Sequence, residues 1–226
     1  TGNDTIVLST APNGASIDLG GGSDSLRFGN FANVATVANA EIITGGTGND
    51  KVTLGSALNV ATAIDLGAGG NTLLLVSGGN HGTVANINTL IGGSGADTIA
   101  LAIAIANASI DLGAGNDILA LANGGNSATV ANTETITGGT GNDSITLATL
   151  ASNASIDFGN GADKLTLGAF ANAATVANVE TILGGAGNDS IVIASALTSG
   201  MALNLGAGAN KLTLAKGCNL GTVGNV

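Results

Sequence analysis

The chain has 226 residues, of which 38 are glycine, and it contains no Trp or Tyr and only one His, one Cys and one Pro. A catalytic pocket usually draws on His, aromatic and mixed charged side chains, so this composition argues against an enzyme and offers no catalytic residue. Fifteen acids against five bases give a net charge of −10, which argues against nucleic acid as a partner.

The chain also lacks the usual marks of membrane insertion. It has no apolar run of transmembrane length and no signal peptide at its start, and its one cysteine cannot form an internal disulfide. Because the sequence starts and stops inside a repeat, we expect it to be a piece of a longer protein.

A six-residue turn motif recurs every 46 or 47 residues. It reads GGTGND at 45–50, GGSGAD at 92–97, GGTGND at 138–143 and GGAGND at 184–189, and the chain opens inside another copy. About 20 residues later a related turn, LGxGxD or a variant of it, ends at Asp24, Asn71, Asp117, Asp163 or Asn210. A fixed period of this size predicts one solenoid domain of five double repeats, at about 1–44, 45–91, 92–137, 138–183 and 184–226.

Short strands are predicted on both sides of each turn. After nearly every motif the second and fourth residues are apolar, as in Val52 and Leu54, and this alternation predicts a half-buried strand. A second strand, SIDL at 16–19 or TVANAEII from Thr36, precedes the next turn. No segment has a helical period. The prediction is an all-β, parallel β-solenoid of about ten coils, each of roughly 20 or 26 residues and carrying one motif.

The acidic residues occupy three positions of the repeat. Eight aspartates close a turn: Asp4, Asp24, Asp50, Asp97, Asp117, Asp143, Asp163 and Asp189. Four others stand six residues before the end of a turn, at Asp18, Asp65, Asp111 and Asp157, and the glutamates share a third position, at Glu41, Glu134 and Glu180. We expect the turn aspartates to stack one above another. Carboxylates about 5 Å apart repel by about 0.8 kcal/mol even in water, so a cation should lie between them.

Calcium suits such columns best. It accepts carboxylate and carbonyl oxygens in flexible geometry, and the sequence has no His or Cys column for zinc or copper. The alternative is that each aspartate caps its own turn by a hydrogen bond to the backbone. For Asp18, Asp65, Asp111 and Asp157 an outward position without metal is the favoured interpretation. The Asn and Glu residues of the TVANxE segments are expected to form hydrogen-bond ladders on a face of the solenoid.

The GGxGxD turn followed by alternating apolar residues resembles the calcium-binding nonapeptide of the repeats-in-toxin (RTX) family. The resemblance implies a right-handed parallel β-roll in which turn aspartates and glycine-turn carbonyls hold several calcium ions between coils. Beside the eight turn aspartates, it implies a role for the turn glycines Gly45, Gly46, Gly48, Gly92, Gly93, Gly95, Gly138, Gly139, Gly141, Gly184, Gly185 and Gly187. The chain departs from the family in three ways. Its expected coils are longer, and a Leu or Phe stands where the first glycine of each LGxGxD turn belongs. Asn71 and Asn210 replace the aspartate at the end of two of these turns. Metal at the LGxGxD turns is therefore left open.

The resulting functional prediction is a calcium-stabilised structural module of a surface-layer protein, adhesin or extracellular filament, which folds when it meets calcium outside the cell. The resemblance implies type I secretion and a location outside a Gram-negative bacterium. One alternative is a non-catalytic RTX module of a secreted enzyme. Another is a glycan- or ice-binding solenoid, which would need a flat face of regular polar side chains. The Thr47–Asn49 pattern suits ice binding, but Ser94 and Ala96 interrupt it. Open strand edges predict end-to-end self-association.

Overall fold

A computed structural model describes residues 1–226 and contains two parallel sheets of twelve strands each. The first sheet consists of β1 (Thr5–Val7), β3 (Ser25–Arg27), β5 (Ile42–Thr44), β7 (Ala63–Asp65), β9 (His81–Ala85), β11 (Thr98–Leu101), β13 (Ile118–Ala120), β15 (Thr135–Thr137), β17 (Ser152–Asp157), β19 (Ala173–Ala177), β21 (Ser190–Ile193) and β23 (Lys211–Thr213). The second consists of β2 (Ala15–Asp18), β4 (Val34–Ala38), β6 (Lys51–Leu54), β8 (Thr72–Leu74), β10 (Thr89–Ser94), β12 (Ala108–Ala114), β14 (Ser127–Ala131), β16 (Ser144–Leu147), β18 (Lys164–Thr166), β20 (Thr181–Leu183), β22 (Ala202–Asn204) and β24 (Thr222–Gly224).

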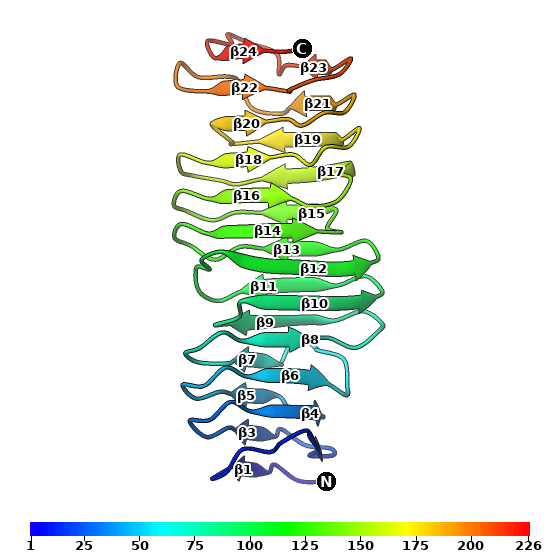
Figure 1. The fold of residues 1–226 in the computed structure, drawn as a ribbon, viewed down its shortest axis with the longest axis vertical. Helices are drawn as coiled ribbons and strands as arrows, with labels where there is room; N and C mark the ends of the chain where they lie inside the picture. The colour runs from blue at the N-terminus through cyan, green and yellow to red at the C-terminus, as the bar shows by residue number, and fades with distance from the viewer.

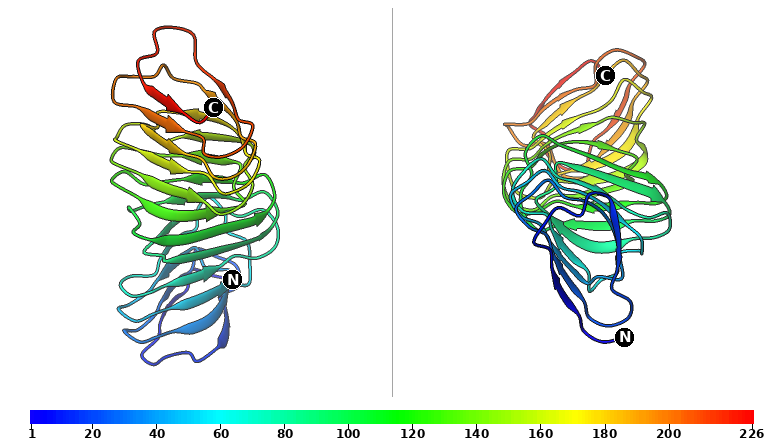
Figure 2. Two further views of the ribbon diagram at one scale, coloured as in Figure 1. Left: turned by 45° about the horizontal axis from the view of Figure 1, so that its top comes forward. Right: turned by 60° about the horizontal axis from the view of Figure 1, so that its bottom comes forward.

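The chain winds as a solenoid in which odd-numbered and even-numbered strands run in opposite directions on opposite sides (Figure 1). Each strand pairs in parallel with the strands of the coils before and after it, except that β1, β2, β23 and β24 at the ends of the sheets pair on one side only. The two termini lie at opposite ends of the stack (Figures 1 and 2). The predicted all-β parallel solenoid is confirmed, with about eleven turns.

The expected coil length was wrong. Paired residues of neighbouring coils are 17, 20 or 21 positions apart, as in Ser25–Ile42, Thr5–Ser25 and Ile42–Ala63. Thr5 and Thr98 begin β1 and β11, which are five turns apart, so one turn averages about 19 residues. A double repeat of 46 or 47 residues therefore makes two and a half turns, where the sequence suggested two longer coils.

The core is a narrow layer of aliphatic side chains between the two sheets. The register places Leu26, Ile43, Ile64 and Val84 in one column of the odd-numbered sheet, and each is at most 2% exposed. Forty-seven buried residues form a single cluster along the whole stack. Burial of each large aliphatic side chain contributes about 1.5–3 kcal/mol to the stability of the fold. The apolar residues of the predicted alternation are therefore the main source of stability.

Asparagine makes many of the corners. Eight asparagines adopt positive φ angles of 50–56°, among them Asn39, Asn86, Asn132 and Asn178. Asn tolerates this left-handed conformation better than other residues with a Cβ, because its short amide can hydrogen-bond locally. No helix of the structure has the length and apolar character that a membrane crossing would require.

Candidate metal-binding turns

The motif turns lie in pairs on alternate edges of the solenoid. Asp50 and Asn71 directly precede the even-numbered strands β6 and β8, whereas Asp97 and Asp117 precede the odd-numbered strands β11 and β13. This alternation follows from the repeat length of two and a half turns. The expectation that all turn aspartates stack in one continuous column, with one motif in each coil, was therefore wrong.

Each group of turns on one edge forms what we call a turn stack, named by the residues that end its successive turns. In chain order the five stacks are Asp4–Asp24–Glu41, Asn33–Asp50–Asn71–Asn88, Asn80–Asp97–Asp117–Glu134, Asn126–Asp143–Asp163–Glu180 and Asn172–Asp189–Asn210. The first, third and fifth lie on the edge that leads into the odd-numbered sheet, and the second and fourth lie on the opposite edge.

A ladder of hydrogen bonds joins the residues of each stack. In the third stack the backbone N–H of Asp97 donates to Oδ1 of Asp117 (2.7 Å), and that of Asp117 donates to Oε2 of Glu134 (2.8 Å). The fourth stack repeats these bonds at Asp143–Asp163 (2.7 Å) and Asp163–Glu180 (2.8 Å). The aspartates thus bind the backbone of the preceding coil, not their own turn. The glutamates take part in hydrogen-bond ladders, as expected. They lie in the same stacks as the aspartates at the edge, so the expectation of a separate column on a face of the solenoid was wrong.

Seven of the eight turn aspartates are buried and retain one oxygen without a partner. Asp4 is exposed; the others are at most 1% exposed, and their Oδ2 atoms accept no hydrogen bond: Asp24, Asp50, Asp97, Asp117, Asp143, Asp163 and Asp189. An unsatisfied buried carboxylate oxygen is strongly unfavourable. These seven oxygens therefore need a proton or a cation.

Two of these carboxyls have a perturbed affinity for protons. Burial away from water raises the pKa of Asp117, a backbone hydrogen bond from Asp97 lowers it, and the charges of Asp97, Glu134 and Asp111 raise it further. At Asp163 burial again raises the pKa most, with the charges of Asp143 and Glu180 adding to it against a hydrogen bond from the Asp143 backbone. Both sites concentrate negative charge in a place that water does not reach.

The glycines leave room for oxygen atoms between coils. A Cβ built on Gly45 would overlap the carbonyl oxygen of Leu66 in the next coil and would lie 2.7 Å from Oδ2 of Asp50. Gly92, Gly138 and Gly184 meet the carbonyls of Leu112, Phe158 and Leu205 in the same way. The first glycine of each motif thus faces a carbonyl oxygen of the next coil, and Gly45 also faces a carboxylate oxygen.

This set of donors fits a hard divalent cation. Calcium takes carboxylate and backbone carbonyl oxygens together, and both line these turns. No group of three or more His, Cys, Asp or Glu side chains is arranged so that these side chains alone could hold a metal ion. Backbone carbonyls would therefore have to supply much of the coordination shell, as the glycine turns allow.

Comparison with known proteins identifies the motif. A sequence model of the RTX calcium-binding nonapeptide repeat matches four times, at residues 37–57, 84–100, 130–147 and 177–192. The chain carries RTX repeats. No match is found among curated proteins. A crystal structure of a hyperactive, Ca²⁺-dependent, β-helical antifreeze protein from an Antarctic bacterium is similar at 20% identity and a TM-score of 0.31, covering 96% of this chain and 82% of that one.

The four RTX matches contain the turns that end at Asp50, Asp97, Asp143 and Asp189, and they omit the LGxGxD turns. Three of them also include a glutamate of the turn stacks, at Glu41, Glu134 or Glu180. The LGxGxD turns nevertheless share the ladder and the unpaired oxygen, at Asp24, Asp117 and Asp163. The GGxGxD and LGxGxD turns therefore offer the same kind of unpaired carboxylate oxygen.

The sequence analysis missed the asparagine that begins each turn stack after the first. Nδ2 of Asn33 donates to the carbonyls of Gly29 (3.0 Å) and Phe31 (2.8 Å) and to Oδ1 of Asp50 (2.8 Å). The same residue type recurs at Asn80, Asn126 and Asn172. Its period of 46 or 47 residues was visible in the sequence, but no glycine motif marks these turns.

The four aspartates expected to point outward, Asp18, Asp65, Asp111 and Asp157, cap corners of the solenoid. Oδ1 of Asp157 accepts the N–H of Gly159 (3.1 Å) and Nδ2 of Asn178 (2.7 Å). Asp18, Asp65 and Asp111 make the equivalent bonds to the glycine two residues on and to the left-handed asparagine of the next coil. These side chains have polar partners at the surface, so they have no need of a metal.

Proposed function

We propose that this chain is a calcium-stabilised β-roll that serves as a structural module of a secreted or cell-surface protein, such as a surface layer, an adhesin or an extracellular filament. The observation that carries the proposal is the set of seven buried Asp Oδ2 atoms without hydrogen-bond partners. The proposed ligands are the turn aspartates together with carbonyl oxygens of the stacked glycine turns. Bound calcium would supply positive charge where neighbouring coils bring carboxylates together.

Folding would then depend on calcium. Each coil packs only on its two neighbours, so the stability of a solenoid is a sum of interfaces between adjacent coils. Carboxylates that meet at these interfaces weaken them unless a cation is present. A chain without calcium would therefore fold weakly, and calcium outside the cell would drive it into the rod. This coupling suits a protein that must cross a membrane unfolded before it functions outside.

A structural role also fits what the polar groups do. The buried acids and asparagines are engaged in ladders between coils, while Cys218 is exposed. If the chain is attached to an enzyme, as some RTX modules are expected to be, the same calcium-dependent scaffold would be its contribution.

Circular dichroism of calcium-stripped protein during titration with calcium, and separately with magnesium, tests the proposal. We expect a cooperative gain of β-structure or a large rise in melting temperature with calcium, and a weaker response to magnesium, which prefers rigid octahedral sites. A protein that is equally stable in chelator and that binds no calcium in equilibrium dialysis would refute it.

A binding role is a second candidate because one face carries a regular row of hydroxyl groups. Thr72, Thr89, Ser109, Thr129, Thr146 and Thr166 are paired in register across six neighbouring strands of the even-numbered sheet. They alternate with buried residues such as Leu90 and Ile110 and so point outward. A glycan array and an ice-recrystallisation assay, each with a Thr129→Tyr variant that interrupts the row, would test for a ligand. Binding unaffected by the variant would exclude this face.

A further inference from the structure

The LGxGxD turn of each stack comes in two chemical forms, and the residue that follows it on the ladder in the next coil varies with it. Where this turn ends in aspartate, a glutamate follows on the ladder: Asp24–Glu41, Asp117–Glu134 and Asp163–Glu180. Where it ends in Asn71, the next residue on the ladder is Asn88. Acid is thus paired with acid and amide with amide, and we call these pairs the closing pairs.

The amide form satisfies its own site. Oδ1 of Asn71 accepts the N–H of Asp50 (2.9 Å). Its Nδ2 donates to three carbonyl oxygens, those of Leu66 (3.2 Å), Gly67 (3.0 Å) and Asn86 (2.9 Å). Asn210 makes the equivalent contacts with the carbonyls of Leu205, Gly206 and Asn225, at 3.4, 3.4 and 3.0 Å. An amide N–H group therefore lies among three oxygens of two successive coils.

The acid form has the same backbone but no donor. Oδ1 of Asp117 accepts the N–H of Asp97, just as Asn71 accepts that of Asp50. Gly113 and Asn132 adopt φ angles of 88° and 50°, close to the 70° and 55° of their counterparts Gly67 and Asn86. Where Asn71 places its amide nitrogen, Asp117 places an oxygen, and this buried Oδ2 has no partner. Carboxylate oxygens and carbonyls that face one another require a cation between them.

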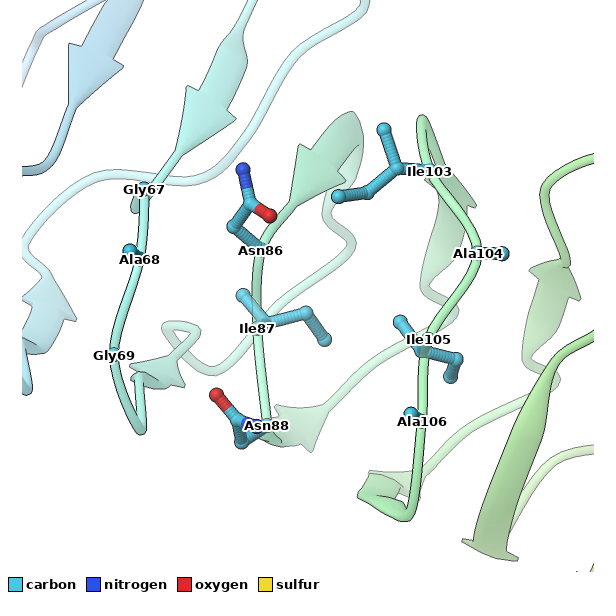
Figure 3. A pocket seen from close by; sticks show the side chains of 10 residues that line it. All are labelled: Gly67, Ala68, Gly69, Asn86, Ile87, Asn88, Ile103, Ala104, Ile105 and Ala106. Carbon is cyan, nitrogen blue, oxygen red and sulfur yellow. The ribbon is translucent and has the colours of Figure 1, made fainter. Parts of the chain in front are cut away.

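Figure 3 shows the surroundings of the amide form. Asn86, Ile87 and Asn88 run between the turn 67–69 and the segment 103–106, and they line an open pocket of about 230 Å³ without any acidic side chain. In the third stack the corresponding segment is Asn132, Thr133 and Glu134, which brings a carboxylate to this place. The closing pair Asn71–Asn88 therefore lacks both the negative charge and the free carboxylate oxygens that a divalent cation needs.

From these contacts we propose that each acidic closing pair binds one divalent cation, with calcium as the favoured ion, and that the side-chain amides of Asn71 and Asn210 replace this ion in the second and fifth stacks. The proposal rests on the proposed function and adds ligands to it: Glu41, Glu134 and Glu180. The sequence thereby sets which coils depend on calcium. The contact between the Asn71 and Asn88 coils consists of neutral hydrogen bonds, so we expect this contact to depend on calcium less than the contacts at the acidic closing pairs.

Two reciprocal double variants test the proposal. Asp117→Asn with Glu134→Gln converts an acidic closing pair to the amide form, and Asn71→Asp with Asn88→Glu converts the amide pair to the acidic form. Calcium bound per chain at saturation is measured by equilibrium dialysis and elemental analysis. We expect one ion fewer in the first variant and one more in the second. We also expect the first variant to melt at a higher temperature than the parent in chelator and the second at a lower one.

Asp111→Asn is the matched control, because it removes one negative charge from the same part of the molecule at a side chain that already has hydrogen-bond partners. Its ion count should equal that of the parent. A parent that binds no calcium would refute the proposed function itself. A parent that binds calcium, with ion counts unchanged in both double variants, would overturn the closing-pair proposal alone. If Asn71→Asp with Asn88→Glu fails to fold, the Asp117→Asn and Glu134→Gln variant still decides.

Discussion

The stability of the calcium-stripped chain should increase as the pH falls, which is the opposite of the behaviour in calcium. Burial and neighbouring carboxylates raise the pKa of Asp117 and Asp163 in the fold. A carboxyl whose pKa is raised by folding binds its proton more readily when folded, so its penalty is present above the folded pKa and disappears as the pH falls through it toward 3.8.

The size of the effect follows from the coil spacing. Carboxylates on neighbouring coils are about one strand spacing apart, about 4.8 Å, and at an effective dielectric constant of about 20 they repel by about 3.5 kcal/mol. For a domain of this length 1 kcal/mol shifts the melting temperature by about 2–4 °C. Protonating one such pair should therefore raise the melting temperature of the metal-free chain by about 10 °C.

Thermal unfolding followed by circular dichroism, on protein stripped of calcium beforehand, measures this shift as the pH is lowered from neutral toward 3.8. In saturating calcium the sign reverses, because protons then compete with the cation for the same oxygens. Asp117→Asn with Asp163→Asn should flatten the dependence in chelator. A metal-free chain that loses stability on acidification would refute the idea that these carboxylates repel one another in the fold.

Further substitutions examine the turns, the core and the corners in thermal or urea unfolding with calcium present. Gly138→Ala should cost about 1–3 kcal/mol or more, because its Cβ would overlap the Phe158 carbonyl, whereas Gly200→Ala, with nothing within 4 Å, should change stability by less than about 0.5 kcal/mol. Leu112→Ala should cost about 2–5 kcal/mol, since Leu112 is fully buried; a smaller loss would indicate that the coils collapse around the cavity. Asp157→Ala should cost about 1–2 kcal/mol through two lost hydrogen bonds, while Asp157→Asn should be nearly neutral because Asn204 makes the same contacts.

The strands could be predicted from the sequence because their signal is local. Val52 and Leu54 alternate with polar residues and are buried in β6 as expected. The length of a coil is not local in this sense. It depends on where the chain turns without a glycine motif, as it does at Asn33 and at the corner before Ala63, where Thr62 donates its N–H to the Asn59 carbonyl (2.8 Å). The distance between successive glycine motifs includes these unmarked corners, so the coil length predicted from it was too long.

The candidate site could be predicted only in part, because the motif is local in the sequence but the contacts between coils are not. The identity of the turn aspartates follows from the motif, but their partners lie 17, 20 or 21 residues away. Only the true register shows that Asp117 lies between Asp97 and Glu134, or that Asn80 begins the ladder. The glutamates had therefore been given a column of their own, although their position one coil after an aspartate makes them part of the same stack.

The half-integral repeat has an electrostatic consequence. Had the double repeat made two whole turns, every turn aspartate would have lain on one edge, in a column of charge interrupted only by Asn71 and Asn210. With two and a half turns, the acids occur in runs of two aspartates and a glutamate at most, and each such run changes edge at the next repeat. An asparagine amide begins each stack after the first, and in the second and fifth stacks another closes it. The arrangement limits the repulsion that the metal-free chain must overcome, and it distributes the proposed calcium cross-links over both edges of the rod.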